Sequence, residues 1–415
     1  MTALLGFRCP GCGSELPPVG PTYGCPGCPS EALDVVLDLT SVSQNAIAID
    51  DRSLWRYAAL LPVSVPDAAT GPLREVGGTP LHAAPRAARH TRATVWIKDD
   101  GRLPTGSLKD CASAVVAMRA RDLGAQRLVT ASTGNAGVAM AAMARAAGLE
   151  PVVLVPAAAP RAKIAQLLVF GAELYLVEGR YDDAFALSRE ASRKLGWYCR
   201  NTAYNPFTAE GKKTAAFEIC EQLAGALGRT GFAAPDRIYV AVGDGNIITG
   251  VHKGLSELHA LGWIDRLPRL MGVQAAGSAA IANAFRAGST RIEPVVANTI
   301  ADSIAADRPA DGWRALRAVR ETHGNYLVVS DDDILAAIVA LGRDATVFAE
   351  PAGAAAYAGF LADARAGNIE AREHVVVLIT GSGLKDVAAA ERAIDTAPVI
   401  EPSLAALERA MKART

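Results

Sequence analysis

The sequence of 415 residues has almost no net charge and no long run of apolar residues. Its 42 Lys and Arg residues nearly balance 43 Asp and Glu residues, and the formal net charge is -1. Such a balance gives no general attraction to nucleic acid or to acidic membranes. No apolar segment reaches the roughly 20 residues of a transmembrane helix, and the first residues lack the basic region and apolar core of a signal peptide. We therefore expect a cytoplasmic protein that binds neither nucleic acid nor a membrane.

Cysteine is also scarce, at seven residues, and four of the seven stand in two close pairs. Residues 9–12 and 25–28 both read Cys-Pro-Gly-Cys. Two such turns bring four thiolates into the tetrahedron of a structural zinc site, as in zinc ribbons. The pattern predicts a zinc-ribbon-like segment over residues 1–40 and a structural zinc ion bound by Cys9, Cys12, Cys25 and Cys28. The alternative is a ribbon that packs without metal.

Short apolar segments alternate with helical patterns through most of the chain. The segments between the apolar ones have the periodicity of helices, and several end at glycine. Strands separated by such helices form a parallel sheet covered on both faces. We expect an α/β fold of two parallel-sheet domains, in which residues 105–205 form a smaller domain inserted between residues 41–104 and 206–395, followed by a C-terminal helix within residues 396–415. Strands are predicted at residues 94–98, 127–131, 152–155, 173–177, 237–242, 270–274, 326–329 and 375–379.

Lys109 lies just before a helix that is predicted over residues 111–123. Thr105 or Ser107 is a candidate cap for this helix. A lysine that is fixed at the end of a rigid element in a dry pocket keeps part of its amine neutral, as a lysine must to form a Schiff base with a carbonyl group. The alternative is an ordinary solvated lysine in a first helical turn, and the local sequence alone favours that alternative.

Three further motifs follow predicted strands and suit the binding of one small molecule. Residues 132–135, Ser-Thr-Gly-Asn, place hydroxyls and an amide at a helix N-terminus, where an anion is favoured. Residues 243–247, Gly-Asp-Gly-Asn-Ile, can turn several backbone N–H groups toward a phosphate, provided that Asp244 points away. Because this loop lacks the Walker lysine and the dinucleotide glycine pattern, it predicts the single phosphate of a cofactor. Thr380 follows the last predicted strand and can bond a neutral ring nitrogen. Each motif alone also fits an ordinary turn or helix cap.

The lysine, the asparagine, the phosphate loop and the hydroxyl, in this order on an α/β frame, resemble the fold-type-II pyridoxal-phosphate enzymes. In particular, the chain resembles the threonine synthase family. The motifs that carry the resemblance lie at residues 54–57, 78–81, 104–110, 132–135, 205–206, 210–214, 348–353 and 380–386.

The resemblance implies pyridoxal 5'-phosphate as the cofactor, an amino-acid substrate and a homodimer. It implies that Lys109 is the catalytic residue, forming the Schiff base and then transferring protons. Asn135 would bond the phenolic oxygen and Thr380 would face the pyridine nitrogen. The cofactor phosphate would be held by the backbone of Gly243, Asp244, Gly245, Asn246 and Ile247, and the substrate would be contacted by Ser132, Thr133 and Lys212.

The activity implied by the resemblance is the conversion of O-phospho-L-homoserine and water to L-threonine and phosphate. Many members of the family have an arginine where this chain has Thr208, and a doubly charged phosphate needs a cation. Arg161, Lys163 or Lys212 would have to replace that arginine. An alternative hypothesis is therefore β-elimination or β-replacement on serine, threonine or O-phosphoserine. A third hypothesis, a zinc-ribbon binding protein whose α/β body has lost catalysis, is disfavoured by the presence of Lys109.

Overall fold

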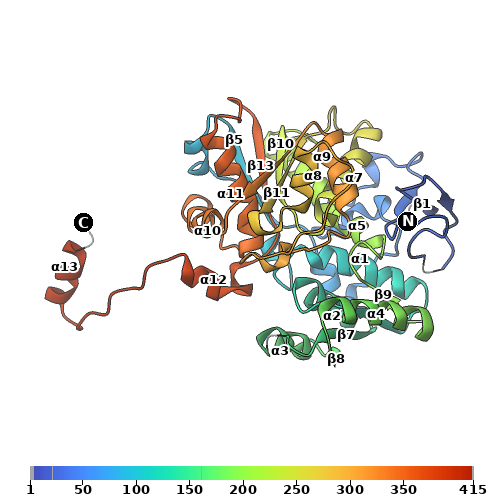
Figure 1. Cartoon of the computed structure of the whole chain (residues 1–415). Helices are drawn as coiled ribbons and strands as arrows, with labels where there is room; N and C mark the ends of the chain where they lie inside the picture. The colour runs from blue at the N-terminus through green and yellow to red at the C-terminus, as the bar shows by residue number, and fades with distance from the viewer. Residues whose placement is uncertain (1–3, 21, 160, 414–415) are drawn as a thin grey trace.

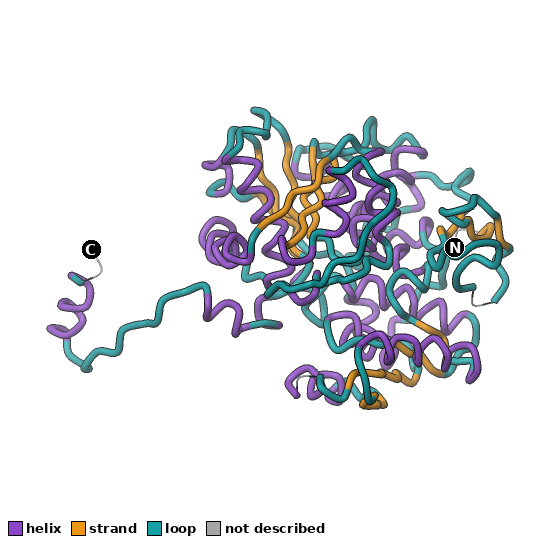
Figure 2. The backbone as a smooth tube through the Cα atoms, in the orientation of Figure 1, coloured by secondary structure: helices purple, strands orange, loops and turns teal. Residues whose placement is uncertain are grey.

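The computed structural model describes residues 4–20, 22–159 and 161–413. Figures 1 and 2 show two separate groups of parallel strands with helices around them, a small N-terminal segment on one side and a C-terminal helix that projects on an extended arm. The expected α/β architecture is confirmed. No helix in the described part of the chain is long and apolar enough to cross a membrane.

The larger sheet has six strands in the order β12-β11-β10-β13-β5-β4. All neighbours are parallel except the edge pair β4 and β5. The central register pairs Tyr239 with Met271 on one side and with Val377 on the other. The strands are β4 (Leu81–Ala83), β5 (Thr94–Asp99), β10 (Arg237–Ala241), β11 (Arg269–Ala275), β12 (Asn325–Val329) and β13 (His374–Ile379).

Both faces of this sheet are buried, which explains why its strands are almost continuously apolar. Successive side chains of β10 point to opposite faces. Ile238 and Val240 belong to a core cluster with residues of α7 and α9, whereas Tyr239 and Ala241 belong to a second cluster with residues of α10 and α11. The helices of this part are α5 (Phe207–Lys212), α6 (Thr214–Ala226), α7 (Asn246–Ala260), α8 (Ala280–Arg286), α9 (Gly312–Glu321), α10 (Asp331–Ala345), α11 (Pro351–Arg365) and α12 (Val387–Arg392).

The smaller sheet has four parallel strands in the order β8-β7-β6-β9. Helices α1 and α2 pack against each other beside it, and α4 packs on β7 (Figure 1). The strands are β6 (Arg127–Thr130), β7 (Glu150–Pro156), β8 (Glu173–Val177) and β9 (Tyr198–Cys199), and the helices are α1 (Lys109–Asp122), α2 (Asn135–Ala146), α3 (Arg161–Val169) and α4 (Tyr181–Leu195).

The N-terminal segment forms a three-stranded antiparallel sheet in the order β2-β1-β3, from β1 (Leu4–Arg8), β2 (Glu15–Leu16) and β3 (Asp34–Leu37). It contacts both α/β parts. The ring of Phe7 packs edge-on against Phe207, and Tyr23 stacks on Tyr204 with ring centroids 4.8 Å apart. The N-terminal segment therefore packs against both α/β parts.

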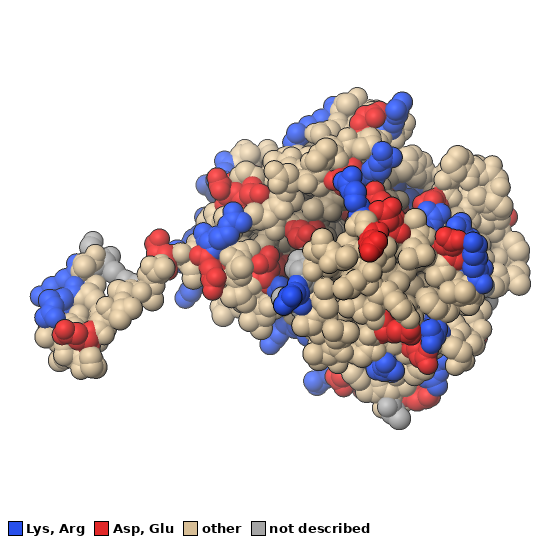
Figure 3. Space-filling model, turned by 60° about the horizontal axis from the view of Figure 1, so that its bottom comes forward, with Lys and Arg blue, Asp and Glu red and all other residues tan. Residues whose placement is uncertain are grey.

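The C-terminal helix α13 (Leu404–Lys412) lies away from the body (Figure 1). Residues 414 and 415 of the predicted C-terminal segment lie outside the described residues. On the face of the molecule in Figure 3, basic and acidic side chains are interspersed, in keeping with the near-zero net charge.

Candidate active site

Lys109 is the first residue of α1, two residues earlier than the start that the sequence predicts. The turn before it is anchored to the end of β13. The N–H of Leu108 donates to the carbonyl oxygen of Thr380 over 3.0 Å, and Ser107 forms a bridge with Gly381. Lys109 and Thr380 therefore lie side by side although 271 positions separate them in the sequence.

The predicted capping of α1 is wrong. The N-cap is Leu108, and neither Thr105 nor Ser107 caps the helix. Thr105 instead binds the carboxylate of Asp110, which accepts from its N–H over 2.7 Å and from its hydroxyl over 2.5 Å. Burial raises the pKa of Asp110 to about 6, against the opposing effect of these two hydrogen bonds. The hydrogen bonds between Asp110 and Thr105 hold the turn before Lys109 and thus fix the position of the lysine.

Burial lowers the pKa of the Lys109 amine below its usual range, and nearby Arg200 adds to this effect, whereas Asp244 and Glu350 oppose it. A lower pKa increases the neutral fraction of the amine, which is the nucleophilic form. The environment of Lys109 therefore suits covalent chemistry at its Nζ atom.

The loop between β10 and α7 has no room for side chains at two positions. A Cβ atom on Gly243 would come within 2.7 Å of the Ile304 Cα atom. Gly245 has a φ of 94°, and a Cβ atom there would lie 2.7 Å from the Ala315 Cβ atom and 2.8 Å from the Asp311 carbonyl oxygen. Glycine is required at both positions, and the loop leads directly into the N-terminus of the 15-residue helix α7, whose first N–H groups have no partner within the helix. This geometry suits a phosphate.

Lys109 and this loop line the same pocket. Its lining residues are Lys109, Thr202, Ala241, Val242, Gly243, Asp244, Gly245, Asn246, Ile247, Ser303 and Ile304, and it contains about 300 Å³ of space between atoms, including its open mouth. Lys109 and residues 243–247 therefore line one pocket, and their binding of one ligand stays a prediction.

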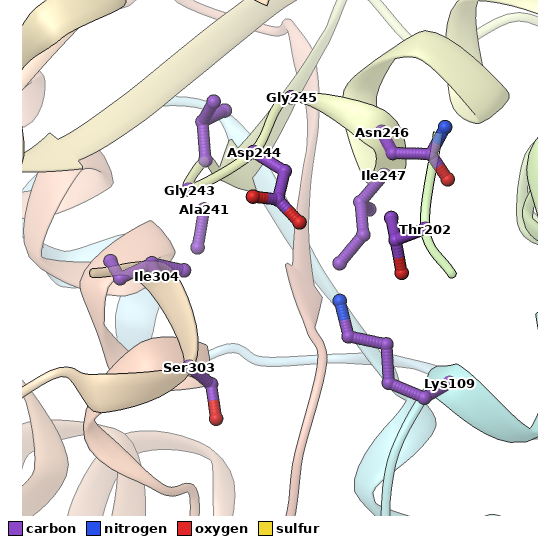
Figure 4. Close-up of a pocket in the computed structure, with 11 residues that line it drawn as sticks. Lys109, Thr202, Ala241, Gly243, Asp244, Gly245, Asn246, Ile247, Ser303 and Ile304 are labelled. Atoms are coloured by element: carbon purple, nitrogen blue, oxygen red, sulfur yellow. The ribbon is translucent and has the colours of Figure 1, made fainter. Parts of the chain in front are cut away.

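Asp244 does not point away from the pocket as expected. Figure 4 shows its carboxylate on the pocket side, where the side chain of Lys109 also extends. Its backbone carbonyl oxygen accepts from the N–H of Asp311 over 2.8 Å, which fixes the loop and leaves the side chain turned inward. The carboxylate partly offsets the positive charge of Lys109 and of buried Lys212.

Lys212 lies behind the loop rather than in the pocket lining. Its Nζ atom donates to the side-chain oxygen of Asn246, and the side-chain nitrogen of Asn246 donates to the Asp311 carboxylate over 2.7 Å. Lys212 is fully buried, and burial together with the charges of Lys109 and Arg200 lowers its pKa well below its usual range. Its contact with Asn246 makes it a support for the loop.

Asn135 begins α2 and faces the large domain. Its side-chain nitrogen donates to both carboxylate oxygens of Glu350, over 2.8 and 3.0 Å, and to the Ser303 hydroxyl over 3.4 Å. Because Ser303 lines the pocket, Asn135 lies at its edge. The Ser132 hydroxyl accepts from the N–H of Gly134 over 3.2 Å within its own turn, next to half-buried Thr133. These residues and buried Thr380 adjoin the pocket without lining it.

The substrate phosphate of the family needs a cation, and position 208 does not provide one in this protein. Thr208 is buried, and its hydroxyl donates to the Asn205 carbonyl oxygen over 2.8 Å. Arg161 is exposed at the start of α3, and the side chain of Lys163 lies outside the described residues. The hydroxyl of Thr208 thus belongs to the start of α5 and is not directed at a ligand.

Several residues of the site were missed by the sequence analysis. They are Arg200, Thr202, Ser303, Ile304 and Glu350. A usable signal existed for the first two, because they directly follow β9, and ligands of parallel sheets bind beyond the carboxyl ends of the strands. Glu350 lies in the motif at residues 348–353, but its contact with Asn135, like the places of Ser303 and Ile304, depends on segments that meet only in the fold.

The four clustered cysteines meet as predicted. Their sulfur atoms all lie within 4.8 Å of one another, with Cys9 and Cys28 3.5 Å apart and Cys12 and Cys25 3.6 Å apart. Four sulfurs about 2.3 Å from a tetrahedral zinc ion would be about 3.8 Å apart. The spacing therefore fits a four-thiolate zinc site, and no open coordination position is left for catalysis.

Comparison with known proteins gives this pocket a family. Residues 73–381 match the family model described as pyridoxal-phosphate dependent enzyme. A threonine synthase of Methanosarcina acetivorans is 36% identical over 384 residues, covering 91% of this chain and 92% of that protein. This chain belongs to the threonine synthase family of pyridoxal-phosphate-dependent enzymes. A threonine synthase of Synechocystis is 38% identical over 340 residues, with 80% of this chain and 84% of that protein covered.

Solved structures of other proteins share this fold. Maize serine racemase superposes with a TM-score of 0.62 at 20% identity, covering 81% of this chain and 92% of that chain. Threonine deaminase isoform 2 of Solanum lycopersicum superposes with a TM-score of 0.62 at 20% identity, covering 80% and 82%. At this identity the likeness establishes the shared fold and nothing about the substrate.

The residues present fit the family's cofactor. A phosphate suits the backbone at Gly243 and Gly245 before α7, where no side chain intervenes, and the inward carboxylate of Asp244 opposes it. An aldehyde suits the amine of Lys109 in the same pocket. The third hypothesis, a body that has lost catalysis, conflicts with this arrangement, because the reactive lysine and the phosphate loop still line one pocket.

Proposed function

We propose that this protein is a threonine synthase that converts O-phospho-L-homoserine and water to L-threonine and phosphate. The observation that carries the proposal is the pocket in which Lys109 and the glycine loop face each other. The identity of 36% over nine-tenths of the chain to a threonine synthase supports the choice of reaction within the family.

When bound, pyridoxal phosphate supplies an aldehyde that joins to amines and an electron sink for the bonds at the substrate's α-carbon. The chain itself supplies the base. The Nζ atom of Lys109, whose pKa is lowered by burial, accepts a proton from the substrate and returns it at a later step. The rigid turn at residues 105–108 holds that atom in place while protons are transferred.

The roles proposed for the other residues follow from their positions. The backbone N–H groups of the loop 243–247 hold the cofactor phosphate. Asn135 and Thr380 hold the two ends of the cofactor ring, and the turn containing Ser132 and Thr133 takes the substrate carboxylate. Lys212 is better suited to fixing Asn246 than to touching the substrate, since it lies behind the loop.

We also propose that zinc bound by the four clustered cysteines is structural. Lys253 of α7 and Arg314 of α9 both contact strand β3 of the ribbon. The Lys253 amine donates to the Val35 carbonyl oxygen over 2.6 Å, and the Arg314 guanidinium pairs with Asp34 over 2.7 Å. A metal that fixes the ribbon therefore also fixes a surface on which helices α7 and α9 rest.

Steady-state assays of the purified holoenzyme test the proposed reaction. O-Phospho-L-homoserine should yield phosphate and threonine in equal amounts, and Lys109→Ala should abolish both products. Formation of 2-oxo acid from serine or threonine, with no phosphate released from O-phosphohomoserine, would overturn the proposal in favour of β-elimination. That alternative is worth testing because Thr208, whose hydroxyl binds the Asn205 carbonyl oxygen, stands where many family members have an arginine for the substrate phosphate.

A further inference from the structure

Arg200 carries a buried positive charge that forms no salt bridge with the described residues. The residue follows β9 directly, and its N–H donates to the Val129 carbonyl oxygen over 2.8 Å, which places it at the carboxyl end of the smaller parallel sheet. The side chain is 0% exposed. Ligands of parallel sheets bind at this end of the strands.

The partners of its guanidinium are neutral. The Nε atom donates to the Ser113 hydroxyl over 3.2 Å, and the Nη1 atom donates to the Thr202 hydroxyl over 2.7 Å. The Nη2 atom is buried and has no hydrogen-bond partner. Among the residues that the structure describes, no carboxylate is recorded in a salt bridge with Arg200. Burial lowers its pKa to about 10, so the group is still charged at neutral pH.

Two other buried arginines show what an ordinary structural arginine looks like in this protein. Arg237 pairs with Glu373 over 2.7 Å, and Arg314 pairs with Asp311 and Asp34. Burying a charge without a partner is costly, and a buried donor without a partner calls for an explanation. Arg237 also has a buried Nε atom without a partner, but of the three only Arg200 has no recorded salt bridge.

The geometry connects this charge to the pocket. Ser113 is one helical turn after Lys109, so both side chains lie on the same face of α1. Thr202 lines the same pocket as Asp244 and Lys109 (Figure 4). Because the Thr202 oxygen accepts from Arg200, its own hydrogen is left to donate to another group. A pocket anion at Thr202 would complete that hydrogen bond and neutralise the buried charge behind it.

We propose that Arg200 determines specificity for the substrate's phosphate, acting through Thr202 as the cation that position 208 does not supply. This inference rests on the proposed function and names the group that receives the substrate's phosphate and retains it as inorganic phosphate when it leaves. Arg200 is a positioning residue, since Thr202 lies between it and the pocket. The cofactor phosphate has its own donors in the loop 243–247, and the two phosphates would be held at different walls.

Calorimetric titration of the holoenzyme with inorganic phosphate tests the inference without requiring turnover. Arg200→Gln should weaken phosphate binding about tenfold to 100-fold, and Arg200→Lys should also weaken it, because an ammonium group cannot reproduce the forked contacts to two hydroxyls. The control Arg193→Gln removes an exposed arginine of α4 in the same domain and should leave binding unchanged. Inhibition by homoserine, which lacks the phosphate, should change little in Arg200→Gln.

Thr202 variants provide a second test that leaves the buried charge in place. Thr202→Val should weaken phosphate binding as Arg200→Gln does, and Thr202→Ser should restore it. Unchanged phosphate binding in both Arg200→Gln and Thr202→Val would overturn the inference. Equal weakening of homoserine and phosphate would show a merely structural role, and loss of cofactor with phosphate binding intact would assign Arg200 to the cofactor phosphate. If the wild-type holoenzyme binds phosphate through Arg200 but does not release it from O-phosphohomoserine, the proposed reaction fails while this inference stands.

Discussion

Arg314 links the N-terminal ribbon to the phosphate loop, and its removal should affect both. The guanidinium Nε and Nη2 atoms donate to the Asp311 carboxylate over 2.5 and 3.0 Å, and the Nη1 atom donates to Asp34 of β3 over 2.7 Å. The same Asp311 carboxylate accepts from the side chain of Asn246 in the loop. One arginine therefore orders a chain of contacts from the ribbon to the start of α7.

The expected magnitude follows from burial. The side chain of Arg314 is 2% exposed and that of Asp311 is 0% exposed, so Arg314→Met leaves a buried carboxylate without its cation. Removing one partner of such a pair costs about 3–5 kcal/mol. Because Asn246 then loses its fixed acceptor, cofactor affinity should fall about twofold to tenfold, as expected for one weakened hydrogen bond.

Arg317→Met is the matched control. Arg317 lies on the same helix and approaches the same Asp34, but at 3.5 Å and with 34% exposure, so its loss should cost less than about 1 kcal/mol. Urea unfolding of the cofactor-free protein and cofactor titration by absorbance measure the two effects. The reasoning is refuted if Arg314→Met loses no more stability than Arg317→Met.

The other predictions concern the loop, a buried acid and the metal. Gly245→Ala should destabilise the protein by about 2–4 kcal/mol and weaken cofactor binding, because its φ is 94° and the new Cβ atom would clash. The control Gly225→Ala, in α6 with open space around it, should stabilise the protein by up to about 1 kcal/mol. Equal effects of the two substitutions on the free energy of unfolding would contradict the geometry. Burial raises the pKa of Asp100 to about 6, so the folded state binds more protons than the unfolded state between about pH 4 and 6, and stability from this group is present below pH 4 and lost as the pH rises through 6. Unfolding curves across this range should show wild type losing about 3 kcal/mol relative to Asp100→Asn, and parallel curves would be inconsistent with the raised pKa. Metal analysis should find one zinc ion per chain. Removal of the zinc by a chelator or by Cys12→Ser should also remove the protection of the ribbon from protease. A ribbon that is equally protected without metal would point to packing alone.

The strands could be predicted because their signals are local. Runs such as residues 237–242 and 375–379 are apolar on both faces of the sheet, and β10 and β13 lie within one residue of the predicted bounds. The glycines at 243 and 245 were recognised because the backbone conformation and close approach they allow leave little choice of residue. The cysteine pairs were equally clear, since spacing alone brings their sulfurs together.

What the sequence could not give depends on segments that meet only in the fold. The loop with the inward-turned Asp244 is held by a backbone hydrogen bond to Asp311, 67 positions away. Arg200 was overlooked because nothing beside it in the sequence shows that its guanidinium would be buried without a carboxylate.

The most direct test of the account is to identify the residue to which the cofactor is attached. Borohydride reduction of the purified holoenzyme, followed by peptide mass spectrometry, should locate the pyridoxyl group on Lys109. Attachment to Lys212 or to another lysine, or no attachment in a protein saturated with pyridoxal phosphate, would contradict the central claim that Lys109 and the glycine loop form one cofactor site.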